Sequence, residues 1–89
     1  MRYSYVTLPD EMYVSHTEMY PNGQVSVHFE QYNTPEGIRE LDILVPSLYI
    51  QYSRGFSAQM IESIINYARN NSELICHLAK VGGFDAACH

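Results

Sequence analysis

Regular alternation of apolar and polar residues runs through the first half of the chain and predicts β-strands. The run RYSYVTL at residues 2–8 alternates in this way and ends at Pro9-Asp10, which is a turn signal. Two further alternating runs flank Pro21-Asn22-Gly23, and the run IRELDILV follows a second turn sequence at residues 35–37. The pattern therefore predicts a strand-rich half that contains a hairpin around the Pro21-Asn22-Gly23 turn.

The turn residues of this hairpin also predict its register. Pro21, Asn22 and Gly23 suit a three-residue loop with a bulge at the glycine, which makes Tyr20 and Gln24 cross-strand partners. Val25, Val27 and Phe29 of the second strand then share the core face. The opposite face pairs His16 with His28. A two-residue Asn-Gly loop would set the apolar residues opposite polar ones, so the pattern favours the bulged turn.

The second half of the chain changes to helical spacing. Pro46 interrupts an alternation that resumes in SLYIQYS, so we expect a bent edge strand or a strand that changes partners at the proline. Ser57 is a good N-cap for a segment whose apolar residues repeat at helical spacing. Asn70-Asn71-Ser72 either kinks this helix or ends it. Residues 57–81 therefore form one long bent helix or two short helices.

Strands followed by helix predict an α+β fold, with an antiparallel sheet of four or five strands and the helical region packed on one face. The 89 residues form a single domain, 1–89, that is strand-rich over 1–54, helical over 57–81 and ends in a tail over 82–89. The other face of the sheet is left uncovered unless the C-terminal segment folds back over it. A homodimer that buries this face would enlarge a small core.

Charge and composition narrow the class of partner. The formal net charge is −5, and the five basic residues are scattered, which argues against direct binding of nucleic acid and mildly favours a cationic protein partner. No apolar run is long enough for a membrane span, and the N-terminal residues lack the apolar core of a signal peptide. Two cysteines fit a reducing compartment. We therefore expect a cytoplasmic protein without a membrane anchor.

Eight tyrosines and no tryptophan form the most unusual feature of the composition. Tyrosine combines an apolar ring with a polar hydroxyl and is enriched at protein interfaces. We expect a protein partner, or a second copy in a homodimer, to bind a surface rich in tyrosines and carboxylates, although some of these tyrosines are expected in the core. The predicted partner-binding residues are Tyr13, Tyr20, Tyr32, Tyr49, Tyr52, His16, His28, Glu18, Glu30, Glu40 and Asp42.

Two sets of residues offer metal-ligand chemistry. His16 and His28, if they are cross-strand neighbours, could share a divalent ion with Glu18 or Glu30 as a third ligand. The doublets Cys76-His77 and Cys88-His89 contain the elements of a Cys2His2 zinc site, although their spacing matches no zinc finger and adjacent residues on a helix point about 100° apart. A solvated histidine pair and a core cysteine explain both sets more simply, so we predict no metal and no cofactor.

The sequence contains no nucleophile elbow, P-loop, dinucleotide fingerprint or His-Glu-x-x-His motif. We therefore predict a small interaction module that acts by surface binding without catalysis. In size and acidity it is similar in type to inhibitors and accessory proteins of phages and mobile elements, although no motif carries that similarity. The alternatives are a metal-binding protein that uses the residues above and an acidic competitor of a nucleic-acid-binding protein.

Overall fold

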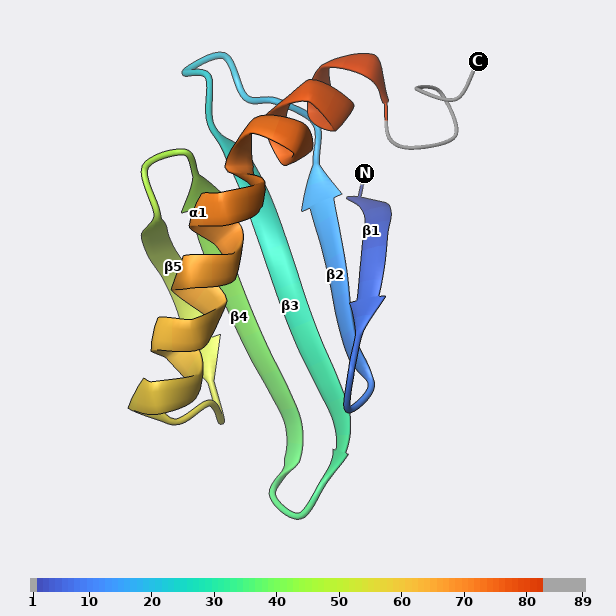
Figure 1. The fold of residues 1–89 in the computed structure, drawn as a ribbon, viewed down its shortest axis with the longest axis vertical. Coiled ribbons are helices and arrows are strands. Elements are labelled where there is room, and N and C mark those ends of the chain that lie inside the picture. Colours follow the sequence, from blue (N-terminus) through green and yellow to red (C-terminus); the bar gives the residue numbers. More distant parts are fainter. Residues whose placement is uncertain (1, 83–89) are drawn as a thin grey trace.

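The computed structural model describes residues 2–82 and shows a five-stranded sheet followed by one helix (Figure 1). The elements are β1 (Arg2–Leu8), β2 (Met12–Thr17), β3 (Val25–Thr34), β4 (Gly37–Val45), β5 (Tyr49–Arg54) and α1 (Ala58–Val81). Each strand pairs antiparallel with the next, so the order across the sheet is β1-β2-β3-β4-β5. The helix crosses one face of the sheet. These elements confirm the predicted α+β fold.

The helical region is one continuous helix. The Ser57 side chain accepts a hydrogen bond from the Met60 backbone N–H at 3.2 Å, and Gly82 ends the helix with a φ of 88°. The Asn-Ser sequence does not break it, because Asn71 and Ser72 direct their side chains back to carbonyls one turn earlier, at Tyr67 and Arg69.

The core lies between α1 and the sheet face that it covers. Alternate residues of β3 and β4 point toward the helix, and the apolar stripe of α1 packs against them. The principal buried residues are Val14, Val25, Val27, Phe29, Leu41, Ile43, Val45, Ile64, Ala68, Ile75 and Leu78. At the β1 side, the Tyr5 hydroxyl donates to Asn71 Oδ1 at 2.8 Å and so ties this edge strand to the helix.

The turn between β2 and β3 forms as predicted, but the register beyond it does not. Tyr20 N–H donates to Gln24 O at 2.8 Å, as the bulged loop requires. Farther along, however, His16 lies opposite Val27 and Ser15 lies opposite His28. Between the Tyr20–Gln24 pair and the His16–Val27 pair, the β2 side of the hairpin contains one residue more than the β3 side. The predicted pairing of His16 with His28 is therefore wrong.

The observed register is favoured by burial. Where the extra residue interrupts the ladder, Thr17 Oγ1 accepts a hydrogen bond from the Ser26 backbone N–H at 3.1 Å. The shift turns Met12 and Val14 toward the helix in place of Tyr13 and Ser15, which increases the apolar area that the core buries. It also turns His16 into the core while His28 stays on the opposite face.

The prediction for Pro46 also needs correction. The chain makes a tight turn between β4 and β5 after a cis Val45–Pro46 peptide bond, and Leu48 N–H donates to Leu44 O at 2.7 Å. The two runs on either side of the proline are thus separate antiparallel strands of one hairpin. They are neither one bent strand nor a strand that changes partners, because the turn reverses the chain direction.

Candidate functional site

The sheet face that points away from α1, here called the outer face, gathers most of the predicted partner-binding residues. Strand pairing aligns His28 with Asp42 and Tyr52, and the next row aligns Tyr13 with Glu30 and Glu40. Eight of the predicted residues lie on this face: Tyr13, Tyr32, Tyr49, Tyr52, His28, Glu30, Glu40 and Asp42. The exposed fractions of these four tyrosines are 46%, 38%, 65% and 45%, in that order.

His28 is the centre of a charged cluster on the outer face. Its Nδ1 lies 2.6 Å from Asp42 Oδ1, and its Nε2 lies 3.0 Å from Glu30 Oε1 and 3.9 Å from Glu40 Oε1. Both ring nitrogens of His28 thus lie within hydrogen-bond distance of carboxylate oxygens. Arg2 Nη2, at 3.3 Å from Asp42 Oδ1, adds the charge of a guanidinium.

The carboxylates of the outer face are therefore partly neutralised. Asp42 contacts both His28 and Arg2, and Glu40 lies opposite Arg54 in the β4–β5 pair. With two arginines beside three carboxylates, the face is less acidic than the net charge of the whole chain suggests. Exposed aromatic rings, more than net charge, therefore characterise this face.

Two of the tyrosines form a connected group at one end of the outer face. The rings of Tyr13 and Tyr32 are 5.6 Å apart and meet edge to face at 65°. The Tyr32 hydroxyl donates to Glu30, and this hydrogen bond is the main cause that raises the pKa of Tyr32. These contacts fix the two rings in place, so a partner would meet a preorganised surface.

Tyr20, Glu18 and His16 do not join the outer face. Glu18 accepts a hydrogen bond from the Tyr3 hydroxyl at 3.1 Å, which is the main cause that raises the pKa of Tyr3. Glu18 and Tyr20 line an open hollow beside the C-terminal end of α1, together with Lys80. The predicted surface is thus divided by the shift in register.

His16 is fully buried on the helix side of β2. Its Nδ1 lies 2.9 Å from Thr17 O, whereas its Nε2 has no hydrogen-bond partner among the described residues. The rings of Tyr3 and Tyr5 surround it, with centroids at 5.6 Å and 6.4 Å. A buried polar atom without a partner costs stability, so His16 is a weak point of the core.

Replacement of His16 by leucine is expected to raise the free energy of unfolding by about 1 kcal/mol, because it removes the unpartnered nitrogen and keeps a side chain of similar volume. Urea denaturation followed by circular dichroism measures the change. The matched variant His77→Leu, at an exposed position of α1, should change stability by less than about 0.5 kcal/mol. A large loss of stability in His16→Leu would contradict this account.

The first candidate metal site does not form, and half of the second lies outside the described residues. His16 and His28 point to opposite sides of the sheet, so they cannot share an ion. Within residues 2–82, no group of three histidine, cysteine, aspartate or glutamate side chains is arranged to hold a metal. Cys76 is half-buried, and burial raises the pKa of its thiol. Cys88 and His89, the other half of the candidate zinc set, lie outside the described residues.

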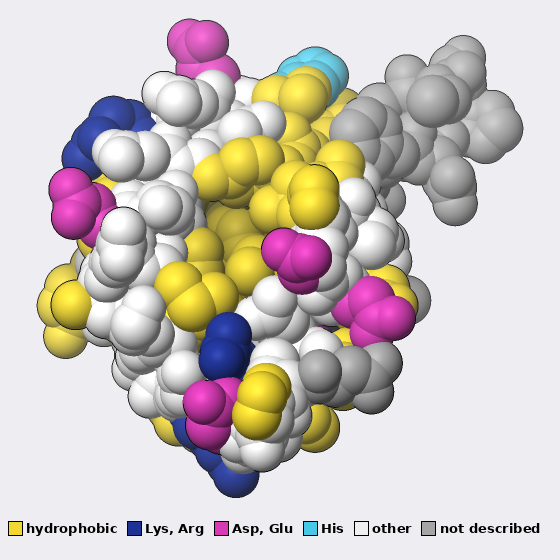
Figure 2. Space-filling model, turned by 60° about the horizontal axis from the view of Figure 1, so that its bottom comes forward, with side chains coloured by type: hydrophobic (Ala, Val, Ile, Leu, Met, Phe, Trp, Pro, Cys, Tyr) yellow, Lys and Arg dark blue, Asp and Glu magenta, His cyan; other side chains and the backbone are white. Residues whose placement is uncertain are grey.

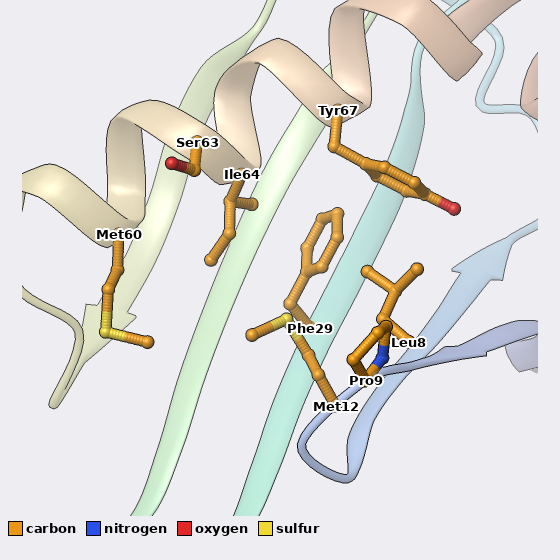
Figure 3. Close-up of a pocket in the computed structure, with 8 residues that line it drawn as sticks. All are labelled: Leu8, Pro9, Met12, Phe29, Met60, Ser63, Ile64 and Tyr67. Atoms are coloured by element: carbon orange, nitrogen blue, oxygen red, sulfur yellow. The ribbon is translucent and has the colours of Figure 1, made fainter.

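A second surface, not predicted from the sequence, lies on the helix side of the sheet. A hollow of about 250 Å³ opens between α1 and the β1–β2 hairpin (Figure 2). Figure 3 shows its lining: Leu8, Pro9 and Met12 from the β1–β2 hairpin, Phe29 from β3, and Met60, Ser63, Ile64 and Tyr67 from α1. We call this hollow the apolar groove. The sequence does not predict this groove, because helical and strand spacing identify apolar residues without indicating which of them remain partly exposed.

Within the described part of the chain, no helix has the length and apolar content needed to cross a bilayer. Comparison with protein-family models, curated proteins and solved structures finds no match to this chain.

Proposed function

We propose that this chain is a small protein-interaction module that binds a protein partner through the outer face and performs no catalysis. The observation that carries the proposal is the presence of four exposed tyrosines on one face of a rigid sheet, opposite the helix. Exposed tyrosines supply large contact areas together with hydrogen-bonding groups. A cytoplasmic inhibitor or accessory protein, of the type that phages and mobile elements carry, is the role that we propose for such a module.

The chemistry of the outer face favours another protein over a second copy. Two copies would each carry a formal charge of −5, and their mutual repulsion disfavours face-to-face pairing. A partner with lysine or arginine side chains could contact Glu30 and Glu40, while its apolar groups pack on the tyrosine rings. Direct binding of nucleic acid is disfavoured by the same charge.

The state of His28 supports a non-catalytic role for this face. Its side chain is 11% exposed, and both ring nitrogens face carboxylate oxygens. A general acid or base needs a ring nitrogen within hydrogen-bond reach of a substrate. In this cluster both nitrogens are engaged with the protein itself, so His28 acts as a structural link between strands.

The double substitution of Tyr13 and Tyr52 by alanine tests the proposal. A partner captured by the wild-type chain, identified by mass spectrometry and then purified, is expected to bind this variant at least about 30-fold more weakly, as loss of one interface hot spot would produce. The matched control is Tyr20→Ala, which removes an exposed tyrosine outside the outer face. It should bind like the wild type, and all variants should melt at similar temperatures.

Two results would contradict the proposal. The partner could bind the double variant as tightly as the wild type, which would remove the outer face from the interface. Alternatively, light scattering could show a stable dimer that dissociates in the double variant, which would make a second copy the occupant of the face.

A further inference from the structure

The tip of the loop between β2 and β3 places an asparagine directly before a glycine. Asn22 and Gly23 are both exposed. Gly23 has a φ of 83°, and nothing lies within 4 Å of the position that a Cβ there would occupy. Solvent therefore reaches this peptide bond, and no side chain at position 23 obstructs the approach of the Asn22 side chain to the next backbone nitrogen.

The Asn22 side chain is held with its carbonyl toward a donor. Asn22 Oδ1 accepts a hydrogen bond from the Gln24 backbone N–H at 3.0 Å. A donor at this oxygen polarises the carbonyl and stabilises the negative charge that develops on Oδ1 when a nucleophile attacks the carbonyl carbon, Cγ. Among residues 2–82, Asn22 Nδ2 has no hydrogen-bond partner, so no contact within this part of the chain retains the group that has to leave.

The nucleophile for this carbonyl is the backbone nitrogen of Gly23. Attack of this atom on Asn22 Cγ closes a five-membered ring, so the covalent chain itself brings the two groups together. In the loop, the Gly23 N–H donates to Tyr20 O at 2.9 Å, and this hydrogen bond has to open before the ring closes. Exposed loop tips open locally at a small part of the cost of global unfolding, so the folded chain reaches the reactive conformation.

We propose that Asn22 is a modification site, which converts spontaneously to a mixture of aspartate and isoaspartate with water as the only co-reactant. Gly23 N bonds to Asn22 Cγ and gives its proton to water, while the Cγ–Nδ2 bond breaks and Nδ2 takes up a proton and leaves as ammonia. The resulting succinimide then adds one water molecule. Opening at the Cγ–N bond gives aspartate, and opening at the bond between the Asn22 backbone carbonyl and Gly23 N gives isoaspartate.

The two products differ in their effect because Gln24 links this loop to the rest of the sheet. Tyr20 N–H donates to Gln24 O at 2.8 Å, and Ser47 N–H in the β4–β5 turn donates to Gln24 Oε1 at 3.1 Å. Aspartate keeps the length of the backbone, and its carboxylate still accepts from the Gln24 N–H. Isoaspartate adds one carbon atom to the backbone of the loop, which displaces Gln24 from these partners. The isoaspartate form is therefore the less stable product.

Timed incubation of the folded chain at mildly alkaline pH, followed by proteolysis and fragmentation mass spectrometry, tests the site. Asn22 is expected to gain one mass unit at least about tenfold faster than Asn66 and Asn70. These two asparagines are also exposed, but they lie within α1, where helical hydrogen bonds hold the following backbone N–H groups. Circular dichroism during the incubation checks that the chain stays folded.

Variants separate the two parts of the proposal. Gly23→Asn keeps a residue that tolerates positive φ but adds a Cβ, so it should slow conversion at position 22 at least about tenfold. Asn22→Asp reproduces the aspartate product and should melt within about 1 °C of the wild type, whereas the isoaspartate form, separated by chromatography, should melt about 5 °C lower.

Each part has a result that would overturn it. Conversion at Asn22 no faster than at Asn66 would show that the loop protects the site, and equal conversion in Gly23→Asn would show that access at position 23 does not control the reaction. An isoaspartate form that melts with the wild type would refute the effect of the lengthened backbone. So would an Asn22→Asp variant that melts as low as the isoaspartate form.

Discussion

Ile75→Ala is expected to lower the free energy of unfolding by about 2 to 5 kcal/mol. Ile75 is fully buried in the interface between α1 and the sheet. The substitution removes apolar area from the core and leaves a cavity that the antiparallel sheet cannot collapse to fill. A domain of this size has a total stability of about 5 to 15 kcal/mol, so the variant would lose a large part of it.

The neighbouring residue gives a matched control. Leu74 precedes Ile75 in the same helix but is 45% exposed, so Leu74→Ala should cost less than about 1 kcal/mol. Urea denaturation followed by circular dichroism, with wild type and both variants at the same temperature, gives the two differences. Equal losses in the two variants would show that α1 does not pack on the sheet through the face that contains Ile75.

The residues that such experiments probe are also the ones that sequence periodicity identifies most securely. Val27 and Phe29 alternate along β3, and Ile64, Ala68 and Ile75 recur at helical spacing along α1. All five are buried. Periodicity succeeds here because a strand and a helix each have only one way to turn such a pattern toward a core.

The hairpin register could not be obtained in the same way. Turn chemistry at Pro21-Asn22-Gly23 determines only the pairs next to the loop, and the loop forms as predicted. One extra residue between His16 and Tyr20 then reverses the faces of β2. The alternation of β3 is unchanged by that shift, so it carries no information about the bulge. The burial of Met12 and Val14 distinguishes the two registers, and that contribution depends on the helix above them.

The apolar groove was missed for a related reason. Strand and helical spacing of apolar residues predicts core positions for Leu8, Met12 and Met60. Whether they are covered depends on the path of α1 across the sheet, which is a property of helix-on-sheet packing and is not encoded in either pattern alone. On the outer face, alternation with buried residues predicts only the residues of β3 and β4, such as His28, Glu30 and Asp42, whereas Tyr13 reaches this face through the shift in register.

His28→Leu is expected to lower the free energy of unfolding by about 1.5 to 3 kcal/mol, the range for hydrogen bonds to charged groups. The substitution removes the donor that stands between Asp42 at 2.6 Å and Glu30 at 3.0 Å. It leaves three carboxylates, at 21% to 29% side-chain exposure, on adjacent strands, where Arg2 still contacts Asp42 and the Tyr32 hydroxyl still donates to Glu30. Added salt should recover part of the loss, because it screens the repulsion among them.

A double-mutant cycle separates this electrostatic effect from loss of packing. If His28 stabilises the sheet by linking carboxylates, Asp42→Asn should cost less stability in the His28→Leu background than in the wild type, with a coupling energy of at least about 1 kcal/mol. His77→Leu, an exposed histidine on α1, should show no coupling with Asp42. Strict additivity of the His28 and Asp42 substitutions would refute the link. A positive coupling would also explain why an uncovered sheet face tolerates three carboxylates between its tyrosines, since contacts within the sheet would then stabilise part of their charge.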